Sequence, residues 1–334
     1  MLDYIYSLGI KWRNKQFDAD TFASYKSSLP VISIGNISTG GTGKSPFVQH
    51  LTRHFLQEGK KSAIIGRGYR RSTKGFLLVS DGKTLYENAK TAGDELFMHA
   101  SALPSAIIIA DEKRSRAAQW IEKNTQCDII LLDDGFQHRH IKRDVDIVLV
   151  DTQTLTTRLL PFGHLREPLT SLQRASVLCF ADSVTQDMKN TLFDNISHLP
   201  KEIYTYSTKI RKIRRAWHSN DDFPQVKICE VLTSIAHPER FHQLLHKSGW
   251  ILTNIYSYPD HYYFTEQDII RICKSNNTSE KSIYITTKDE GKLSYFKHIF
   301  EQYSVECYVV EIETYIENQE QFNSFVNLSI SKRL

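Results

Sequence analysis

Short apolar segments alternate with helical patterns along the first half of the chain. These segments lie at residues 31–34, 62–65, 107–110, 128–133, 146–151 and 176–181. Strands that are covered by helices on both faces have this continuous apolar character. Their alternation with helices predicts an α/β fold built on a parallel sheet.

The alternation is interrupted between residues 209 and 222 and then resumes. The interruption combines a basic run at residues 209–215 with the polar cluster Ser-Asn-Asp-Asp at residues 219–222. Beyond it, helices are expected to begin near Pro238 and Thr265, and strands are expected at residues 226–232, 251–256, 282–286 and 307–312. We therefore expect two α/β domains, at residues 1–208 and 223–334, separated by a cleft and joined by a linker at residues 209–222.

A glycine-rich segment follows the first predicted strand and precedes a predicted helix. It reads Gly-Asn-Ile-Ser-Thr-Gly-Gly-Thr-Gly-Lys-Ser over residues 35–45. Backbone N–H groups that carry no neighbouring side chains can converge on a polyphosphate, and the positive end of the next helix faces the same charge. Ser38 replaces the first glycine of the general phosphate-loop pattern. The segment predicts a nucleotide site at Gly40, Gly41, Thr42, Gly43, Lys44 and Ser45.

Within such a loop the lysine and the hydroxyl have separate tasks. Lys44 would reach the β- and γ-phosphates of a nucleotide, and Ser45 would ligate Mg²⁺. The strand at residues 128–133 adds two carboxylates, Asp133 and Asp134, where a Walker-B aspartate belongs. Taken alone, that pattern also fits an ordinary turn, because aspartate favours turns.

Composition indicates a folded protein of more than one core. The chain has 334 residues, of which 40% are hydrophobic, and a formal net charge of +4 that gives no reason to expect nucleic acid. Its five cysteines are far apart and form no C-x-x-C pair, so neither zinc nor a disulfide framework is indicated. No apolar stretch approaches the roughly 18 residues of a membrane span, and no secretory signal is evident. We therefore expect a cytoplasmic protein.

The first residues form an amphipathic helical pattern. Leu2, Ile5, Leu8 and Trp12 recur at helical spacing beside the basic residues Lys11, Arg13 and Lys15. Such a helix can lie in a lipid headgroup layer with its apolar face down. It can equally pack its apolar stripe against the rest of the domain.

Three further polar clusters flank predicted strands or helices. They lie at residues 66–71 (Gly-Arg-Gly-Tyr-Arg-Arg), 93–95 (Gly-Asp-Glu) and 135–139 (Gly-Phe-Gln-His-Arg). At the ends of parallel strands, arginines suit phosphate groups and a carboxylate can accept a proton from a substrate hydroxyl. Any one of them can also be a solvated loop.

These motifs occur in the order and spacing of a known family. They are Gly35-Asn36 leading into residues 40–46, Arg67-Gly68-Tyr69, Gly93-Asp94-Glu95, residues 133–139, residues 165–168 (Leu-Arg-Glu-Pro) and Asp260-His261. Together they resemble the tetraacyldisaccharide 4′-kinases, the lipid A 4′-kinase family of Gram-negative bacteria. The resemblance runs from the N-terminus through the second domain and is densest between residues 31 and 170.

The resemblance implies a reaction and an architecture. The reaction is transfer of the γ-phosphoryl group of ATP to the 4′-hydroxyl of a tetraacylated glucosamine disaccharide 1-phosphate, giving lipid IVA at the cytoplasmic face of the inner membrane. The architecture is two α/β/α sandwich domains, the first with the parallel sheet of a P-loop NTPase, joined by a short two-stranded β linker. The family's N-terminal helix is membrane-associated, which favours the interfacial interpretation of residues 2–15 and an anionic membrane surface as a partner.

Catalytic roles follow from the resemblance by motif match. Asp94 takes the position of the catalytic base, and His261 takes that of the histidine that supports it. A histidine from the second domain would orient Asp94 only when the cleft closes. Lys44 and Mg²⁺ would neutralise charge on the transferring phosphoryl group.

The implied metal and anion contacts come from the first domain. Ser45 and Asp133 would ligate Mg²⁺, with Asp134 or Glu95 contributing through water. Arg67 and Arg166 would contact anions. Whether these are ATP phosphates or the lipid 1-phosphate stays open, because an arginine fork suits either.

The sequence departs from the family pattern in four places. Ser45 stands where threonine is usual, Leu96 where proline is common, and Arg70 where glycine is frequent, while residues 286–289 (Thr-Thr-Lys-Asp) are shorter than the usual Thr-Thr-Glu-Lys-Asp. Ser45 keeps the hydroxyl. No role is assigned to Lys288 or Asp289.

Two functions of other classes stay open at this point. One is a phosphate-loop kinase of a soluble metabolite, which would not need an amphipathic basic N-terminus. The other is a nucleotide-driven switch or metallochaperone. Residues 287–289 (Thr-Lys-Asp) lack the residue between lysine and aspartate that a guanine reader has, so they argue poorly for GTP.

Overall fold

Seven strands form the sheet of the first unit in a computed structural model that describes residues 2–217, 227–275 and 282–331. Their order is β7-β6-β1-β5-β2-β4-β3, and all neighbours are parallel except the antiparallel β3 and β4. The strands are β1 (Val31–Gly35), β2 (Ser62–Gly66), β3 (Leu77–Asp81), β4 (Ile107–Ala110), β5 (Ile129–Asp133), β6 (Val145–Val150) and β7 (Val177–Ala181). The predicted parallel α/β sheet is confirmed.

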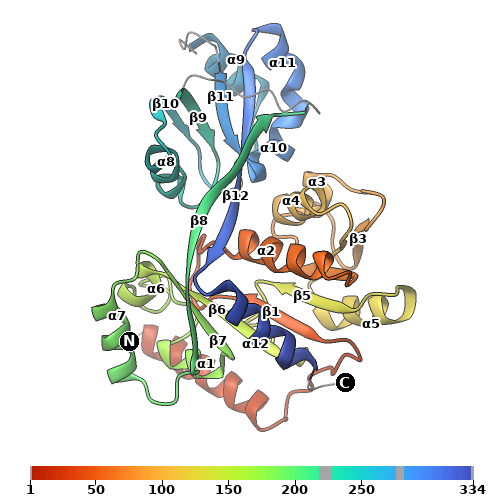
Figure 1. Cartoon of the computed structure of the whole chain (residues 1–334), viewed down its shortest axis with the longest axis vertical. Coiled ribbons are helices and arrows are strands. Elements are labelled where there is room, and N and C mark those ends of the chain that lie inside the picture. Colours follow the sequence, from red (N-terminus) through yellow and green to blue (C-terminus); the bar gives the residue numbers. More distant parts are fainter. Residues whose placement is uncertain (1, 218–226, 276–281, 332–334) are drawn as a thin grey trace.

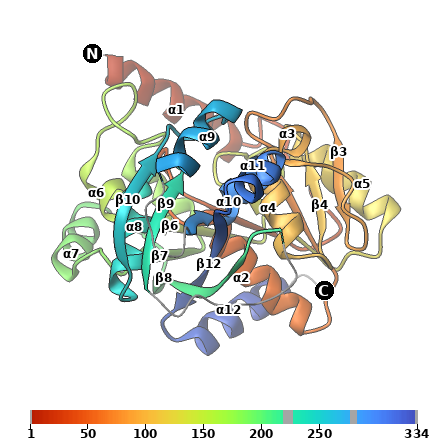
Figure 2. The ribbon, with the colours of Figure 1, turned by 90° about the horizontal axis from the view of Figure 1, so that it is seen from above.

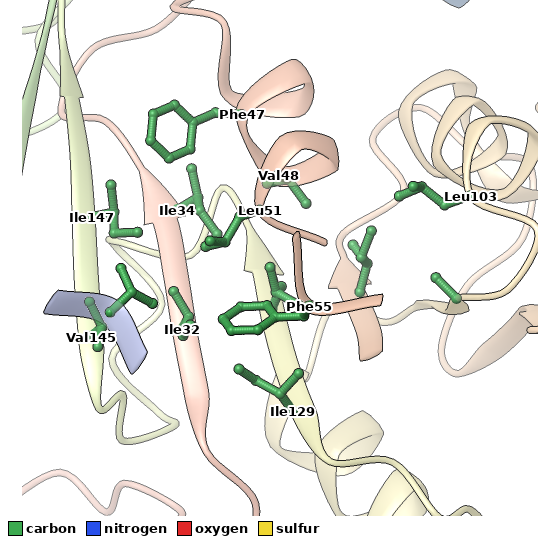
Figure 3. Close-up of a cluster of buried hydrophobic side chains, with 14 of the residues drawn as sticks. Ile32, Ile34, Phe47, Val48, Leu51, Phe55, Leu103, Ile129, Val145 and Ile147 are labelled. Atoms are coloured by element: carbon green, nitrogen blue, oxygen red, sulfur yellow. The ribbon is translucent and has the colours of Figure 1, made fainter. Parts of the chain in front are cut away.

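Helices cover both faces of this sheet because alternate strand residues point to opposite sides. They are α1 (Leu2–Asp18), α2 (Lys44–Gln57), α3 (Ala89–Ala92), α4 (Asp94–Ala102), α5 (Arg114–Asn124), α6 (Thr152–Thr156), the 3₁₀ helix η1 (Leu169–Arg174) and α7 (Gln186–Asn195). On one face, Ile32 and Ile34 of β1 pack against Phe47, Leu51 and Phe55 of α2 (Figure 3). The opposite face packs against α5, η1 and α7.

The second unit repeats the arrangement on a smaller scale. Strands β9 (Ile228–Thr233), β10 (Ile251–Ser257), β11 (Ser282–Thr286) and β12 (Glu306–Ile316) lie in the order β10-β9-β11-β12, all parallel. Helix α8 (Pro238–Lys247) covers one face, and α9 (Glu266–Ser275) and α11 (Lys297–Gln302) cover the other. Helix α10 (Thr287–Leu293) and the 3₁₀ helix η2 (Ser294–Phe296) connect β11 to α11.

Two long strands join the units. Strand β8 (Glu202–Arg215) begins parallel to β7 in the first unit and continues into the second, where it pairs antiparallel with β12. Figure 1 shows β8 and β12 running together between the lower and upper parts of the molecule. Among the described residues, the sheet is therefore continuous through twelve strands.

The expected domain boundaries differ from the packing in two places. The basic run that was predicted to lie in a linker belongs to β8, whereas the polar cluster at residues 219–222 lies outside the described residues. After β12 the chain returns to the first unit, where α12 (Gln319–Ser331) packs on the same core as α2 through Phe322, Val326 and Ile330 (Figure 1 and Figure 2). Residues 319–331 thus complete the first unit instead of the second.

Candidate active site

The glycine-rich segment lies between β1 and α2, as predicted. Gly40 and Gly43 have φ values of 104° and 82°, a region that residues with a Cβ rarely occupy. The side-chain amide of Asn36 donates to Ser38 Oγ at 3.1 Å and to Thr42 Oγ1 at 3.0 Å across the loop. These bonds hold residues 38–42 in a compact turn at the N-terminus of α2.

Ser38, the departure from the phosphate-loop pattern, has a structural role. Its side chain is buried, lies 3.1 Å from Thr154 Oγ1, and accepts the bond from Asn36. Its backbone forms an antiparallel bridge with Leu165. The hydroxyl therefore ties the start of the loop to Thr154, and the backbone ties it to Leu165.

Lys44 and Ser45 lie beside the two carboxylates that follow β5. Lys44 Nζ is 3.3 Å from Asn36 Oδ1 and 3.7 Å from Asp134 Oδ1, while Ser45 Oγ is 3.5 Å from Asp133 Oδ2. The parallel pairing of β1 with β5 brings the carboxyl ends of both strands to one edge of the sheet. The lysine, the hydroxyl and the two carboxylates that the sequence singled out therefore lie together at this edge.

Each carboxylate is held by a side chain from another segment. Buried His99 on α4 places Nε2 2.9 Å from Asp133 Oδ2. Arg166 donates two bonds of 2.8 Å to the two oxygens of Asp134, and its fork also bonds Asn36. Burial alone would raise the pKa of Asp134, but Lys44 and Arg166 outweigh it and hold this pKa well below its ordinary value.

Asp94 and His261 meet across the two units. Asp94 begins α4 directly after Gly93, and His261 follows β10 in the second unit; His261 Nδ1 is 3.0 Å from Asp94 Oδ2. Both residues are buried. Burial raises the pKa of Asp94, but the His261 hydrogen bond and the charges of Lys292 and Lys288 outweigh it, so the pKa lies below its ordinary value.

Two lysines of α10, which sequence analysis left without a role, approach this pair. Lys288 Nζ lies 3.2 Å from Asp260 Oδ1, 3.5 Å from His261 Nε2 and 3.8 Å from Glu95 Oε1. Lys292 Nζ lies 3.6 Å from Asp94 Oδ2. In the sequence, only the segment at residues 286–289 pointed to these lysines. That segment is one residue shorter than the family pattern, so no role was assigned from it.

The second unit also contacts the phosphate loop. Arg240 on α8 donates to Gly41 O at 2.7 Å and to Asp151 Oδ2 at 2.6 Å. A Cβ built on Gly40 would lie 2.7 Å from Nε2 of His237, so the absence of a side chain at Gly40 allows that histidine to sit over the loop. Sequence analysis noted only that a helix begins near Pro238.

Two arginines follow the carboxyl ends of β2 and β4. Arg67 is exposed just after β2, and Tyr69 places its ring 5.2 Å from that of His261. Arg114, which sequence analysis missed, is buried at the start of α5. It interacts electrostatically with Asp134, Asp133 and Arg67. Burial lowers the pKa of Arg114.

Helix α1 turns its apolar side outward. Tyr4, Ile5, Leu8 and Trp12 have exposed fractions of 66%, 58%, 47% and 60%. Its polar side faces the site: Tyr6 OH donates to Arg166 O at 2.9 Å, and Asn14 donates to buried Glu167 at 2.9 Å. The alternative that the apolar stripe packs internally is wrong for Ile5, Leu8 and Trp12.

Two negative findings apply to the described residues. Across residues 2–217, 227–275 and 282–331, no helix is long and apolar enough to cross a membrane. Within the same ranges, no three His, Cys, Asp or Glu side chains converge as a preformed metal site.

Comparison with known proteins identifies the family. A sequence model of the tetraacyldisaccharide-1-P 4′-kinases matches residues 1–331. A tetraacyldisaccharide 4′-kinase from Chlorobium phaeovibrioides is 32% identical over 331 residues, covering 96% of this chain and 93% of the relative. A relative of the same name from Aquifex aeolicus is 32% identical over 306 residues, covering 89% and 90%.

A solved structure agrees over nearly the whole length. The crystal structure described as the "apo" form of LpxK from Aquifex aeolicus in complex with ATP has a TM-score of 0.78 and 28% identity, covering 98% of this chain and 97% of that one. The match includes both units and the strands that join them. The chain therefore belongs to the tetraacyldisaccharide 4′-kinase family, and it is a kinase of lipid A biosynthesis that uses a hydroxyl group as its phosphoryl acceptor.

Proposed function

We propose that Asp94 is the general base in transfer of the ATP γ-phosphoryl group to the 4′-hydroxyl of a tetraacylated glucosamine disaccharide 1-phosphate, giving lipid IVA. The observation that carries this is the bond between Asp94 and His261, with Nδ1 and Oδ2 3.0 Å apart. A carboxylate whose pKa is held low stays ionised and can accept a proton at neutral pH. His261 orients one oxygen and leaves the other for the substrate.

In the proposed step, the γ-phosphoryl group moves from ATP to the 4′-oxygen of the lipid. The 4′-oxygen forms a bond to the γ-phosphorus as the bond from that phosphorus to the bridging β,γ-oxygen breaks, and ADP leaves. The hydroxyl proton moves to Asp94. Lys44 from the phosphate loop neutralises charge that develops on the phosphoryl oxygens.

The residues around Lys44 fit a magnesium ion. Ser45, Asp133, Asp134 and Glu95 offer only oxygen atoms, which Mg²⁺ prefers. Mg²⁺ in kinases is commonly held by one or two carboxylates together with substrate phosphates, so a preformed cage is not required. When bound, the ion would neutralise the charge of the phosphates. His99 and Arg166 would keep Asp133 and Asp134 turned toward it.

Arg67 and the apolar side of α1 are proposed to contact the lipid substrate and its membrane. Arg67 is exposed directly after β2 and suits an anion, either an ATP phosphate or the lipid 1-phosphate. Arg166 is bonded to Asp134 and Asn36, so we assign it to holding those groups. The outward apolar residues of α1 fit a peripheral position at the cytoplasmic face of the inner membrane, with the exposed Lys11 and Lys15 near anionic lipid.

The test of this proposal is phosphorylation of detergent-dispersed tetraacyl disaccharide 1-phosphate by ATP and Mg²⁺, followed by mass spectrometry of the lipid. We expect one added phosphate at the 4′ position and a fall in kcat of about 10² to 10⁴-fold in Asp94→Ala. Binding of a non-hydrolysable ATP analogue should be retained. Asp187→Ala is the matched control, because Asp187 is an exposed aspartate in the first turn of α7.

Other outcomes of that test contradict separate parts of the proposal. Loss of ATP-analogue binding in Asp94→Ala would contradict the role of Asp94 as a base. An unchanged lipid with protein that binds ATP would contradict the assigned acceptor.

A further inference from the structure

Helix α10 reaches the proposed base from the second unit, and its residue Lys292 is buried at the contact. Lys292 Nζ lies 3.6 Å from Asp94 Oδ2 and 2.8 Å from Asp289 Oδ1, and it is only 7% exposed. A lysine at such low exposure is seldom found without paired acceptors. It therefore sits between two carboxylates, one from each unit.

The position of Lys292 is fixed by a network at the end of β9. Lys292 Nζ donates to Ser234 O at 3.2 Å and to Ser234 Oγ, and Asp289 accepts from Ser234 and from Thr286 Oγ1. The backbone N–H of His261 donates to the same Ser234 carbonyl at 3.3 Å. One serine thus links Lys292 to His261, and both side chains contact Oδ2 of Asp94.

A glycine permits the close approach of α10 to α4. A Cβ built on Gly291 would lie 2.6 Å from the ring of Phe97 on α4 and 3.2 Å from Cβ of Ala89 on α3. Thr287 adds a bond from Oγ1 to Met98 Sδ at 3.2 Å. Because residue 291 has no side chain, Lys292 is carried close to the first turn of α4.

The opposite side of α10 is bonded to the strands that join the units. Arg214 of β8 donates two bonds, of 2.8 and 2.7 Å, to Glu290 and one of 2.6 Å to Glu311 of β12. Bidentate arginine bonds impose a defined geometry as well as attraction. The helix is therefore held from behind as its lysines face the site.

We propose that Lys292 is a positioning residue for phosphoryl transfer: from the second unit it holds Oδ2 of Asp94, the same oxygen that His261 contacts, and so leaves Oδ1 for the substrate. The proposal rests on the assignment of Asp94 as the base. Because Lys292 belongs to the second unit and Asp94 to the first, the base is correctly oriented only when the units are together.

The experiment compares kcat and the KM for ATP in Lys292→Met and in the double variant Asp289→Asn, Lys292→Met. The double variant guards against unfolding, since a lone buried Asp289 charge would be costly. An asparagine at this position can still accept from Ser234 through its oxygen, and its NH2 group can donate to the hydroxyl of Thr286. Lys297→Met is the matched control, because Lys297 on α11 is an exposed lysine paired with Glu301 at 3.5 Å. Asp94→Ala is assayed in parallel.

We expect kcat to fall at least tenfold in both variants, with the KM for ATP and the melting temperature of the double variant close to those of the parent. A double variant that keeps kcat within twofold, beside an inactive Asp94→Ala, would overturn the role of Lys292 alone. A joint change in kcat, KM and melting temperature would also overturn it, in favour of a merely structural role. An active Asp94→Ala would instead overturn the proposed base, and the role of Lys292 with it.

Discussion

Three aspartates of the site are each held by a hydrogen bond from a side chain elsewhere in the chain. Asp133 is bonded by His99, Asp134 by Arg166, and Asp94 by His261. A buried carboxylate without such a partner would be protonated or destabilising. The partners come from distant positions in the chain, so the chemistry of each aspartate depends on the fold.

The buried side chain of His138 predicts how the free energy of unfolding depends on pH. Burial, and after it the charges of Arg114 and other basic groups, lower the pKa of His138 to about 3. Since the unfolded value is 6.5, the folded state keeps its full stability above pH 6.5 and loses it as the pH falls toward 3. At pH 5 the loss should be up to about 2 kcal/mol, and replacing His138 with Gln should remove it.

Urea denaturation at pH 7 and pH 5 checks this expectation. The exposed His164 replaced with Gln is the control and should leave the pH dependence of the parent unchanged. An equal pH dependence of unfolding in His138→Gln and the parent would contradict the assignment.

At the scale of elements, α1 and α12 lie against the first unit in different ways. Helix α1 bonds through its polar side and exposes apolar side chains, whereas α12 buries its apolar side chains in the main core. Because the outward apolar face of α1 is not covered by the first unit, we infer that it contacts a partner outside the chain.

The outward face of α1 predicts lipid binding that fails when it is charged. Ile5→Glu with Leu8→Glu should reduce affinity for vesicles containing anionic lipid by about tenfold or more, because each apolar side chain contributes roughly 1.5–3 kcal/mol when buried. Co-sedimentation measures this. Leu328→Glu, at an exposed leucine of α12, is the control; equal vesicle binding by all three proteins would remove α1 from the membrane contact.

The C-terminal helix should stabilise the unit to which it returns. Phe322 is fully buried and meets the rings of Phe47 and Tyr204 edge-on at 5.8 and 5.2 Å. Phe322→Ala should lower the free energy of unfolding by about 3–5 kcal/mol, measured in urea, with Leu328→Ala as a near-neutral control. A loss below about 1 kcal/mol would mean that α12 contributes little to the core.

At the scale of the whole molecule, the second unit contacts the first at two points of the site. One is the group around Asp94, and the other is the pair of Arg240 with Asp151 and Gly41 O beside the phosphate loop. Both contacts require the arrangement that β8 and β12 impose. We therefore expect nucleotide binding and the position of the proposed base, Asp94, to depend on how the units meet.

Removing the second contact should weaken ATP binding. Arg240→Ala removes the bonds to Asp151 and to the Gly41 carbonyl. The state in which the second unit contacts the phosphate loop then becomes less populated, and the apparent Kd for ATP rises by the same factor. We expect a severalfold weaker Kd for a non-hydrolysable ATP analogue by calorimetry. Arg271→Ala, at an exposed pair with Asp268, is the control, and an unchanged Kd in Arg240→Ala would contradict the link.

Much of the first unit was predictable because its signals are local. Buried parallel strands are continuously apolar, and the phosphate loop needs glycines at fixed spacing, so six strands and the loop were located near their observed bounds. The residue pattern did not locate β8, because its basic residues interrupt the apolar pattern of the other strands, and only the family resemblance implied a two-stranded β linker. In the structure, Arg214 and Arg215 are paired with Glu290, Glu311 and Glu306, which lie 75 or more positions away in the chain.

The sequence by itself determined the α/β class, the phosphate loop and, through its motifs, the family and its reaction. Only the tertiary structure placed Lys292 beside Asp94, Arg240 on the phosphate loop, and α12 on the first core. The reason is physical: strand and loop signals depend on neighbours along the chain, whereas a buried charge or an apolar helix face is satisfied by whichever distant segment the fold brings to it.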